Sequence, residues 1–473
     1  MASAERYDVI VVGGGLAGLT AANRATQLGL RTAVLEAGAD ERYLCNTRYT
    51  MGFLHVAFNA TTAEADVLRK AIEAATDGAA RPDLAQAFAE NVGRAVSWLS
   101  DQGIRYIKGG PFDWMNRVLA PPGVRRPGLH WEGRSGDVLL KTLGQRFKDA
   151  GGTLMLGTRA KNLMMDNGRC VGVEADRGAE RIELAAGAVV LADGGFQANA
   201  DLVRQHISPL PEKLCVRNAA TGRGDGLQMA ERVGAKLVGL DRFYGHVQCR
   251  EALQDTTLWP YPILDLLVTA GIVVDRHGRR FADEGRGGIY MTNAIAALDE
   301  PDTAIVIFDD AIWNGTGREY ILPPNPNAVE AGATLISRND LGSLAQALDL
   351  PAAQLQAAVA AYNAFVQKPA SAIEPPRSSR AARPEPIVKA PFHAFRVCAG
   401  ITYTMGGVAV DGGACVLDQS DRPIAGLFAA GSTTGGLEGG GGPVGYIGGL
   451  AKALTLGLLA AESAAKEQGR AVA

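Results

Sequence analysis

The first forty residues contain two apolar runs on either side of a helical stretch. Apolar residues fill positions 9–12 after Tyr7 and Asp8, residues 19–28 follow a helical pattern, and a second apolar run ends at Glu36. Strands that alternate with helices are typical of a parallel sheet covered by helices. The pattern therefore predicts that the chain begins with the βαβ unit of an α/β domain.

The later pattern predicts that a second domain interrupts the first. Residues 62–104 are predicted to be helical throughout, and another helix is predicted over 138–150. Strands are predicted over 153–156 and 170–175, with a hairpin turn at 166–169 between them. Residues 188–195 predict a buried strand that runs into a glycine turn, and residues 424–431 repeat that pattern. We therefore predict that the chain returns to its first domain near the C-terminus.

The chain is predicted to divide into a first domain, an inserted domain and a return segment. Residues 240–390 mix strands and helices and contain more aromatic residues, and residues 368–386 have the composition of a surface loop. The predicted fold is α/β, with a Rossmann-type domain over 1–241 and 394–473. A smaller α+β domain over 242–393 is predicted to interrupt it.

The first βαβ unit carries a glycine pattern that binds dinucleotides. Gly13, Gly15 and Gly18 form a G-x-G-x-x-G loop between the first strand and its helix. Gly13 allows the tight turn, Gly15 lets the backbone approach a pyrophosphate, and Gly18 lets helix and strand pack closely. The helix N-terminus then offers free N–H groups to the phosphates. Glu36 follows at the distance of the acid that holds the ribose hydroxyls.

Composition and charge exclude several other classes of protein. Hydrophobic residues make up 47% of the chain, enough for a large core, and the net charge of -3 gives no reason to expect nucleic acid. The six cysteines form no CxxC motif, so we predict no metal site and a cytoplasmic location. No signal peptide is recognisable, and the apolar stretch at 450–465 contains Lys452 and Glu462. That stretch therefore predicts a packed helix and no membrane span.

Six motifs along the chain resemble those of one flavoprotein superfamily. They are VIVVGGGLAGL near the start, then AVVLADGGF, TGRGDGLQMA, VVDRHGRRFADE, TYTMGGVAVD and GLFAAGSTTGGLEGGGG. In this order they resemble the FAD-dependent fumarate reductase, succinate dehydrogenase and 3-ketosteroid dehydrogenase superfamily. The resemblance implies a Rossmann-type FAD domain interrupted by a capping domain, with the active site between them over the flavin ring. It also implies an FAD-dependent dehydrogenase or reductase that acts on CH–CH groups.

The resemblance places the cofactor FAD against residues from several parts of the first domain. Asn46 stands near the place where membrane succinate dehydrogenases carry a histidine bonded to flavin, which implies FAD held without a covalent bond. The helix that starts near Gly448 would direct its positive end at the flavin pyrimidine. For Asp225, a turn-forming Asp-Gly pair is an equal alternative. The residues implied for FAD binding are Gly13, Gly15, Leu16, Ala17, Gly18, Glu36, Ala37, Asn46, Thr47, Ala160, Asp193, Gly194, Asp225, Gly431, Ser432 and Gly448.

The candidate catalytic positions differ from those of fumarate reductases in three places. Tyr403 stands at the histidine of the His-Thr-Met-Gly-Gly motif, and Tyr446 lies in the segment that replaces Asn-Arg-Leu-Gly-Gly. Gly288 stands where the proton-donating arginine is expected, whereas a histidine before the capping domain is retained as His246. Arginine binds a carboxylate bidentately and tyrosine cannot, so small dicarboxylates are poor candidate substrates. The tyrosines are similar instead to those of the ketosteroid dehydrogenase branch.

These residues predict the α,β-desaturation of a ketone, either a cyclic ketone or a keto acid. Tyrosine hydroxyls polarise the carbonyl oxygen, a base removes the α-proton, and the β-hydrogen leaves as hydride to flavin N5. A tyrosine base needs a neighbouring cation or a strong hydrogen bond to lower its pKa. Arg286 or His246 is expected to supply it to Tyr290, Tyr403 or Tyr446. Packing alone explains Tyr290 and His246 equally well.

Two alternative functions stay open at this point. One is an ene-reductase or a dehydrogenase of a carboxylic acid, similar to enzymes that act on fumarate, urocanate or tricarballylate, with Arg286 as a displaced positive charge. The other is a non-catalytic FAD-binding subunit of a complex. A second dinucleotide motif is absent from the sequence, so no dedicated NAD domain is predicted. The expected partners are a small-molecule substrate and an electron acceptor, which is a quinone, oxygen or a carrier protein.

Overall fold

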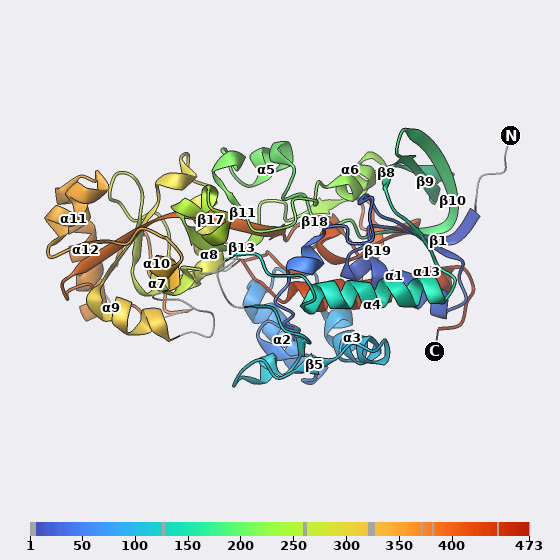
Figure 1. The fold of residues 1–473 in the computed structure, drawn as a ribbon, viewed down its shortest axis with the longest axis horizontal. Helices are drawn as coiled ribbons and strands as arrows, with labels where there is room; N and C mark the ends of the chain where they lie inside the picture. Colours follow the sequence, from blue (N-terminus) through green and yellow to red (C-terminus); the bar gives the residue numbers. More distant parts are fainter. Residues whose placement is uncertain are drawn as a thin grey trace.

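Two β-sheets organise the molecule. The computed structural model describes residues 6–124, 128–258, 263–319, 327–369, 372–380, 383–441 and 444–472. Within these ranges an eight-stranded sheet lies toward one end of the long axis, and a six-stranded sheet lies toward the other (Figure 1). The site described below is built where segments from both parts meet.

The eight-stranded sheet is built around the first βαβ unit. Six of its strands, in order across the sheet, are β19 (Cys415–Leu417), β20 (Pro423–Ala429), β10 (Glu180–Leu191), β1 (Arg6–Val12), β2 (Thr32–Leu35) and β7 (Thr153–Met155). The other two lie off this order, because β9 (Arg169–Arg177) pairs with β10 and β8 (Thr158–Asp166) pairs with β9. All neighbours in this order are parallel except β19 and β20. β20 and β10 are the two strands predicted to run into a glycine turn, and their pairing brings the C-terminal segment back to the first domain.

Helices from distant parts of the chain pack together on this sheet. α1 (Leu16–Gln27) packs against α13 (Gly449–Glu467) and α4 (Ser135–Asp149), and α13 also packs against α3 (Pro82–Asp101). α13 contains the apolar stretch at 450–465 and is buried over most of its length, as predicted. Across the described parts of the chain, no helix has the length and apolar character needed to cross a membrane.

Two local predictions are wrong in detail. The region 62–104 is not helical throughout: α2 (Ala65–Thr76) ends at Asp77, which has a φ of 50, and α3 begins at Pro82. A left-handed residue at a helix C-terminus ends the helix. The turn at Asn167 and Gly168 is correct, but it joins β8 (Thr158–Asp166) to β9 (Arg169–Arg177), whereas β7 pairs with β2. β8 was missed because its sequence, TRAKNLMMD, has little apolar alternation.

The six-stranded sheet is built around one long strand, β17 (Phe392–Thr404). Its neighbours are β11 (Cys215–Val216), β13 (Phe243–Cys249), β15 (Ile305–Asp309) and β16 (Ile336–Arg338), and β14 (Ile272–Val274) follows β15. β11 precedes the predicted boundary at 242, and β17 crosses the predicted boundary at 393, so the sheet draws strands from both sides of each boundary. The domain boundaries themselves stay a prediction.

In the described parts of the chain, six helices accompany this second sheet. They are α7 (Asp265–Ala270), α8 (Gly288–Ala296), α9 (Asp310–Asn314), α10 (Asn327–Glu330), α11 (Leu341–Leu348) and α12 (Ala352–Gln367). Two others are α5 (Ala200–His206), between β10 and β11 in sequence, and α6 (Asp225–Arg232), between β11 and β13. Three small sheets complete the fold: β12 (Leu237–Val238) with β18 (Gly407–Ala409) and β21 (Thr434–Gly435), β3 (His55–Val56) with β4 (Asn59–Ala60), and β5 (Tyr106–Ile107) with β6 (Val118–Leu119).

Candidate functional site

The glycine loop between β1 and α1 has the geometry of a pyrophosphate cradle. Gly13 has a φ of 101, and a Cβ there would lie 2.6 Å from the carbonyl oxygen of Ala192. A Cβ on Gly18 would lie 1.9 Å from the oxygen of Gly13, so neither position accepts a side chain. A Cβ on Gly15 would meet only Thr47 Oγ1, at 3.7 Å. The loop therefore packs tightly on the sheet side and leaves space beside Gly15, where a phosphate group fits.

Glu36 lies directly against this loop. Its carboxylate accepts hydrogen bonds from the backbone N–H of Gly14 (2.8 Å) and from that of Gly38 (2.7 Å), the residue after Ala37. Burial raises the pKa of Glu36 above its usual value, while these backbone donors and Arg48 oppose the rise. The acid predicted for the ribose is thus held beside the phosphate loop, and its contact with the ribose of FAD stays a prediction.

The predicted flavin-side residues line one large cavity. The cavity has a volume of about 940 Å³, and Asn46, Thr47 and Ser432 contribute to its wall. Asn46 is fixed at both ends, because its Nδ2 donates to the oxygen of Thr402 (2.9 Å) and its Oδ1 accepts from the N–H of Ala219 (3.0 Å). Thr47 Oγ1 accepts from the N–H of Leu16, the first residue of α1 (3.1 Å). A hydrogen bond therefore connects the segment that contains Asn46 and Thr47 to the helix that follows the phosphate loop.

The glycines after β20 and before α13 bring the return segment close to the cofactor loop. Gly431 has a φ of 70, and a Cβ there would lie 2.9 Å from the Cβ of Ala17 in α1. Gly448 has a φ of 119, and a Cβ there would lie 2.2 Å from the oxygen of His55. Only glycine fits at both positions without strain. α13 follows directly, and its residues Gly449, Leu450 and Ala453 line the cavity, so its N-terminus faces the flavin side.

Three predicted cofactor residues have side chains that are buried or bound to other residues of the protein. Asp225 forms a two-pronged ion pair with Arg159, at 2.7 and 2.8 Å. Ala160 is buried in β8. Asp193 accepts a hydrogen bond from the N–H of Gly226 (2.8 Å), and burial raises its pKa to about 6. Gly194, which follows it, has a φ of 93 and open space where a Cβ would lie. Contact of these positions with FAD stays a prediction.

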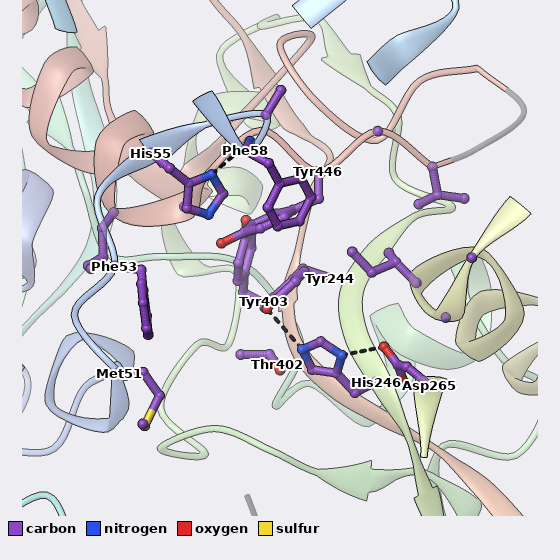
Figure 2. A pocket seen from close by; sticks show the side chains of 18 of the residues that line it. Met51, Phe53, His55, Phe58, Tyr244, His246, Asp265, Thr402, Tyr403 and Tyr446 are labelled. Atoms are coloured by element: carbon purple, nitrogen blue, oxygen red, sulfur yellow. Dashed lines mark hydrogen bonds and ion pairs between the residues drawn. The ribbon is translucent and has the colours of Figure 1, made fainter. Parts of the chain in front are cut away.

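Four of the five predicted catalytic residues line the same cavity, and the fifth does not. Tyr403, Tyr446, His246 and Arg286 contribute to the wall. Figure 2 shows the first three of these side chains grouped in the cavity. Tyr290 packs against the hydrophobic cluster of Tyr403, Met405 and Val444 and stands outside the lining that the described residues form. The Arg286 guanidinium lies 5.2 Å from the centre of the Tyr290 ring, and its Nε lies 3.5 Å from Asp283 Oδ2.

The hydroxyl of Tyr403 is engaged by a buried ion pair. Tyr403 donates to Glu438 Oε2 (3.2 Å), and Glu438 Oε1 lies 3.1 Å from Lys452 Nζ. Lys452 also donates to the oxygen of Thr434 (2.9 Å), and both charged side chains are buried. Burial, followed by the nearby Glu438 carboxylate, raises the pKa of Tyr403 well above its usual value. A phenol held in this way is a poor base.

Tyr244, a tyrosine that sequence analysis missed, has its hydroxyl beside a histidine, whereas that of Tyr403 is beside a carboxylate. Its hydroxyl lies 2.9 Å from His246 Nε2, and His246 Nδ1 lies 2.7 Å from Asp265 Oδ2 (Figure 2). Asp265 Oδ1 accepts from the N–H of Val247 (2.9 Å). A Cβ on Gly288 would lie 2.2 Å from Asp265 Cγ, which places the carboxylate at the N-terminus of α8, where negative charge is stabilised. Asp265, His246 and Tyr244 therefore form a hydrogen-bonded chain that ends in the cavity.

This chain fixes the direction of each hydrogen bond. When the Asp265 carboxylate accepts from Nδ1 of a neutral His246 ring, Nε2 is left as the acceptor for the hydroxyl hydrogen of Tyr244. The Tyr244 ring stacks on Tyr446, with centroids 4.2 Å apart and an angle of 19°. Tyr244 and His246 are two positions apart in β13, and alternate side chains of a strand lie on the same face. This spacing from the predicted site residue His246 is the signal that could have identified Tyr244.

Sequence analysis also missed an aromatic group and two arginines. Phe53, His55, Phe58 and Trp114 line the cavity, as do Arg217 and Arg380. Arg217 is buried and donates from Nη1 to Thr402 Oγ1 (2.7 Å). Within the described ranges, no cluster of three or more His, Cys, Asp or Glu residues is placed to hold a metal ion.

The cradle, the cavity and the fold define a flavoprotein, and comparison with known proteins identifies its family. The family described as "FAD binding domain" matches residues 8–443, so the chain belongs to this family. The crystal structure of a 3-ketosteroid-delta4-(5alpha)-dehydrogenase from Rhodococcus jostii RHA1 aligns with a TM-score of 0.70 and 22% identity, covering 98% of this chain and 97% of that one. This similarity confirms the predicted fold class, a Rossmann-type FAD-binding domain interrupted by a second domain.

Two enzymes of known activity are similar in sequence. An NADH:fumarate oxidoreductase of Klebsiella pneumoniae is 28% identical over 488 residues, covering 98% of this chain and 48% of that protein. A 4-oxocyclohexanecarboxylate 2-dehydrogenase of Sinomonas cyclohexanicum is 32% identical over 336 residues, covering 63% of this chain and 54% of that protein. The chain thus spans about half the length of these relatives.

The comparisons confirm the predicted superfamily and FAD as the cofactor. The activity on CH–CH groups, which the names of these relatives carry, is taken up as a proposal below. The residues present fit this cofactor, because the loop around Gly15 leaves room for the pyrophosphate and Asn46, Thr47 and Ser432 stand at one cavity wall. The substrate, the direction of the reaction, the electron acceptor and the cellular location stay predictions.

Proposed function

We propose that this protein desaturates a ketone at the bond between its α and β carbons. The observation that carries the proposal is the chain from Asp265 through His246 to Tyr244, which ends beside Tyr446 in the cavity. Both distances, 2.7 and 2.9 Å, lie within the range for proton transfer between positioned groups. A chain of this kind turns a weakly acidic hydroxyl into a base, as an aspartate and a histidine do for a serine nucleophile.

In this proposal Tyr244 removes the α-proton, and its own proton passes to His246 Nε2. The resulting imidazolium is stabilised by Asp265, which keeps its negative charge at the N-terminus of α8. The Tyr446 hydroxyl donates to the ketone oxygen and stabilises the negative charge that develops there, a role worth about 3 kcal/mol. Bound FAD supplies the acceptor for the β-hydrogen, which leaves as a hydride.

The proposal changes the roles first assigned to the tyrosines. Tyr403 becomes a packing residue whose hydroxyl stays on Glu438, and Tyr290 packs against the cluster that contains Tyr403. His246 keeps the role of acting on a tyrosine, although its partner is Tyr244. The electron acceptor is proposed to be a quinone, oxygen or a carrier protein, as expected from the sequence.

One observation favours a second candidate, a dehydrogenase or reductase of a carboxylic acid. Arg217, Arg286 and Arg380 line the cavity, and Asp265 is the one carboxylate among the described lining residues. Asp265 is already bound to His246 and Val247. Arg286 and Arg380 also have the acidic partners Asp283 and Asp77 outside the lining, but the guanidinium groups are the charges on the cavity wall itself, where they would meet an anion. A keto acid satisfies both observations, because its carboxylate would face an arginine while its carbonyl faces Tyr446. The third function, a non-catalytic FAD-binding subunit, leaves the hydrogen-bonded chain without a role.

Anaerobic reduction of bound FAD distinguishes these functions. The protein is mixed with cyclohexanone, 4-oxocyclohexanecarboxylate or succinate, and the flavin absorbance is followed. Bleaching by either ketone supports desaturation of ketones, and a preference for the keto acid supports the role of the arginines. Bleaching by succinate alone, or reoxidation of reduced protein by fumarate alone, refutes the ketone proposal. Absence of any response, with FAD shown to be bound, supports the non-catalytic subunit.

A further inference from the structure

One side of the cavity is a continuous wall of aromatic rings. This aromatic wall consists of Phe53, His55, Phe58 and Trp114, and three of its members are labelled in Figure 2. His55 stacks on Phe58 with centroids 5.0 Å apart and an angle of 11°. Trp114 meets both of them edge-on at 5.4 Å and lies 5.6 Å from Phe53. The rings support one another and present flat faces and edges to the cavity.

Phe58 occupies a turn that is unfavourable for its residue type. Ala57 and Phe58 form the two-residue turn between β3 and β4, with φ values of 44 and 60. Hairpin turns with positive φ at both positions favour Asn-Gly, because bulky side chains resist the left-handed conformation. Asn59 Nδ2 donates to the oxygens of Val56 (3.2 Å) and Ala57 (2.9 Å) and holds the turn in place. Residues with strained backbone are found most often at active sites and at segments that hold ligands.

The strained turn presents the Phe58 ring to the cavity instead of burying it. Phe58 is 49% exposed, although it contacts His55, Trp114 and Tyr446. Phe58 also lines the cavity, so the part of its ring that these neighbours leave uncovered is available for contact with a ligand there.

The aromatic wall is uncharged at neutral pH. His55 Nδ1 accepts the backbone N–H of Phe58 (3.2 Å), and burial lowers the pKa of His55 to about 4. A neutral imidazole among three hydrocarbon-rich rings keeps the wall apolar. A flat, apolar part of a substrate is therefore its best complement.

The aromatic wall lies one ring away from the proposed carbonyl site. The Tyr446 ring meets His55 edge-on at 5.4 Å and Phe58 at 6.1 Å. The Tyr446 ring also stacks on Tyr244. A substrate whose oxygen is held by the Tyr446 hydroxyl would thus place its next ring against the wall.

We propose that the aromatic wall selects cyclic ketones that carry a fused or attached aromatic ring over saturated ketones of the same size. The inference rests on the proposed function and names its substrate class. Edge-to-face and offset-stacked ring pairs gain more than the burial of equal apolar area, by roughly twofold to tenfold in binding per pair. Phe58 supplies the main contact, and Trp114 and His55 hold it in position.

Binding of two matched ketones tests the proposal without turnover. The probes are 2-tetralone and trans-2-decalone, which share a fused two-ring ketone skeleton and differ in the aromatic character of the second ring. Each is titrated calorimetrically into the FAD-loaded protein after anaerobic reduction, because the reduced cofactor cannot accept a further hydride. We expect 2-tetralone to bind at least fivefold more tightly than trans-2-decalone, and Phe58→Leu to bring the ratio within twofold.

Phe112→Leu is the matched control. Phe112 also stacks on Trp114 (6.5 Å, 8°) and is 52% exposed, but it stands outside the lining formed by the described residues. Its substitution is expected to leave the binding ratio unchanged. A second variant, Ala57→Asn with Phe58→Gly, removes the ring and relieves the turn, so it guards against a folding defect. It is expected to unfold at a higher temperature than the parent protein and to lose the preference for 2-tetralone.

Several outcomes would overturn the proposal. These are equal binding of the two ketones, an undiminished preference in Phe58→Leu, an equal loss in Phe112→Leu, or no binding of either ketone. Turnover assays separate this failure from that of the proposed function. If both ketones are desaturated without a binding preference, the aromatic wall has no selective role. If 2-tetralone binds preferentially but bleaches no flavin in the oxidised protein, the wall stands and the proposed reaction fails.

Discussion

Substitution of Tyr244 by phenylalanine tests the proposed proton chain most directly. The change removes one oxygen atom and keeps the ring that stacks on Tyr446 at 4.2 Å. It leaves His246 Nε2 without its hydrogen-bond donor, while the bond from Nδ1 to Asp265 remains. The shape of the cavity is therefore preserved, and the chemistry loses its base.

The size of the effect follows from the role. Proton transfer by a positioned base contributes about a hundredfold to ten-thousandfold in rate, which is roughly 3–5 kcal/mol of the barrier. The lost hydrogen bond costs about 1 kcal/mol of folding stability. We therefore expect the rate of flavin reduction to fall at least a hundredfold, with little change in the temperature of unfolding and with FAD still bound.

The assay is anaerobic single-turnover reduction of the bound flavin by a ketone, followed by rapid-mixing absorbance. Exchange of the α-hydrogen of the ketone in heavy water, followed by NMR, isolates the proton step. Tyr106→Phe is the control, because the Tyr106 hydroxyl donates to the oxygen of Val96 (3.3 Å) away from the cavity lining. That variant is expected to react at the parent rate.

The comparison with Tyr403→Phe decides whether Tyr244 or Tyr403 is the base. Tyr403 faces Tyr244 across β13 and β17, and their ring centroids lie 5.3 Å apart. Because its hydroxyl is bound to Glu438, its loss should reduce stability by about 2 kcal/mol and change turnover much less than the loss of the Tyr244 hydroxyl. A larger loss of turnover in Tyr403→Phe than in Tyr244→Phe, or α-hydrogen exchange that continues in Tyr244→Phe, would refute the reasoning.

Three further predictions address Tyr446, the buried ion pair and His55. Tyr446→Phe should lower turnover at least tenfold with FAD retained, and near-normal steady-state turnover would remove Tyr446 from the mechanism. Lys452→Met should cost about 3–5 kcal/mol in urea unfolding because it leaves Glu438 buried and unpaired, and adding Glu438→Gln should recover part of that loss. His55 has a folded-state pKa of about 4, below its unfolded value, so the unfolded state binds more protons between about pH 6.5 and 4. Stability is therefore lost as pH falls through this window, by up to about 3 kcal/mol, and His55→Gln should show a smaller loss in unfolding curves at pH 7 and pH 4.5.

Much of the cofactor side followed from local sequence patterns. β1, the glycine loop and α1 are consecutive, and the contact that requires glycine at position 18 lies within that unit, although Gly13 also meets Ala192 directly after the paired strand β10. Glu36 lies at the end of the adjacent strand, so its spacing in sequence placed it correctly beside the loop. Local periodicity is sufficient in such a unit because the neighbours in sequence are also the neighbours in space.

The catalytic side depended on contacts between distant segments. Tyr403 was placed in the cavity from its motif, but the sequence could not show that Glu438 and Lys452, from the return segment, engage its hydroxyl. Tyr244 gains its importance from Asp265, which lies on a different element, and from Tyr446, about 200 residues later in the chain. The role of each hydroxyl is set by its hydrogen-bond partner rather than by its position in a motif.

The sequence by itself determined the α/β class, the dinucleotide loop and the set of motifs that identify an FAD-binding protein. Only the tertiary structure decided which tyrosine meets a histidine, which meets a carboxylate, and that Phe58 is held in a strained turn at the cavity. The physical reason is that periodicity fixes which face of an element a side chain occupies. The packing of β13, α8, α13 and the turn after β3 fixes which faces meet.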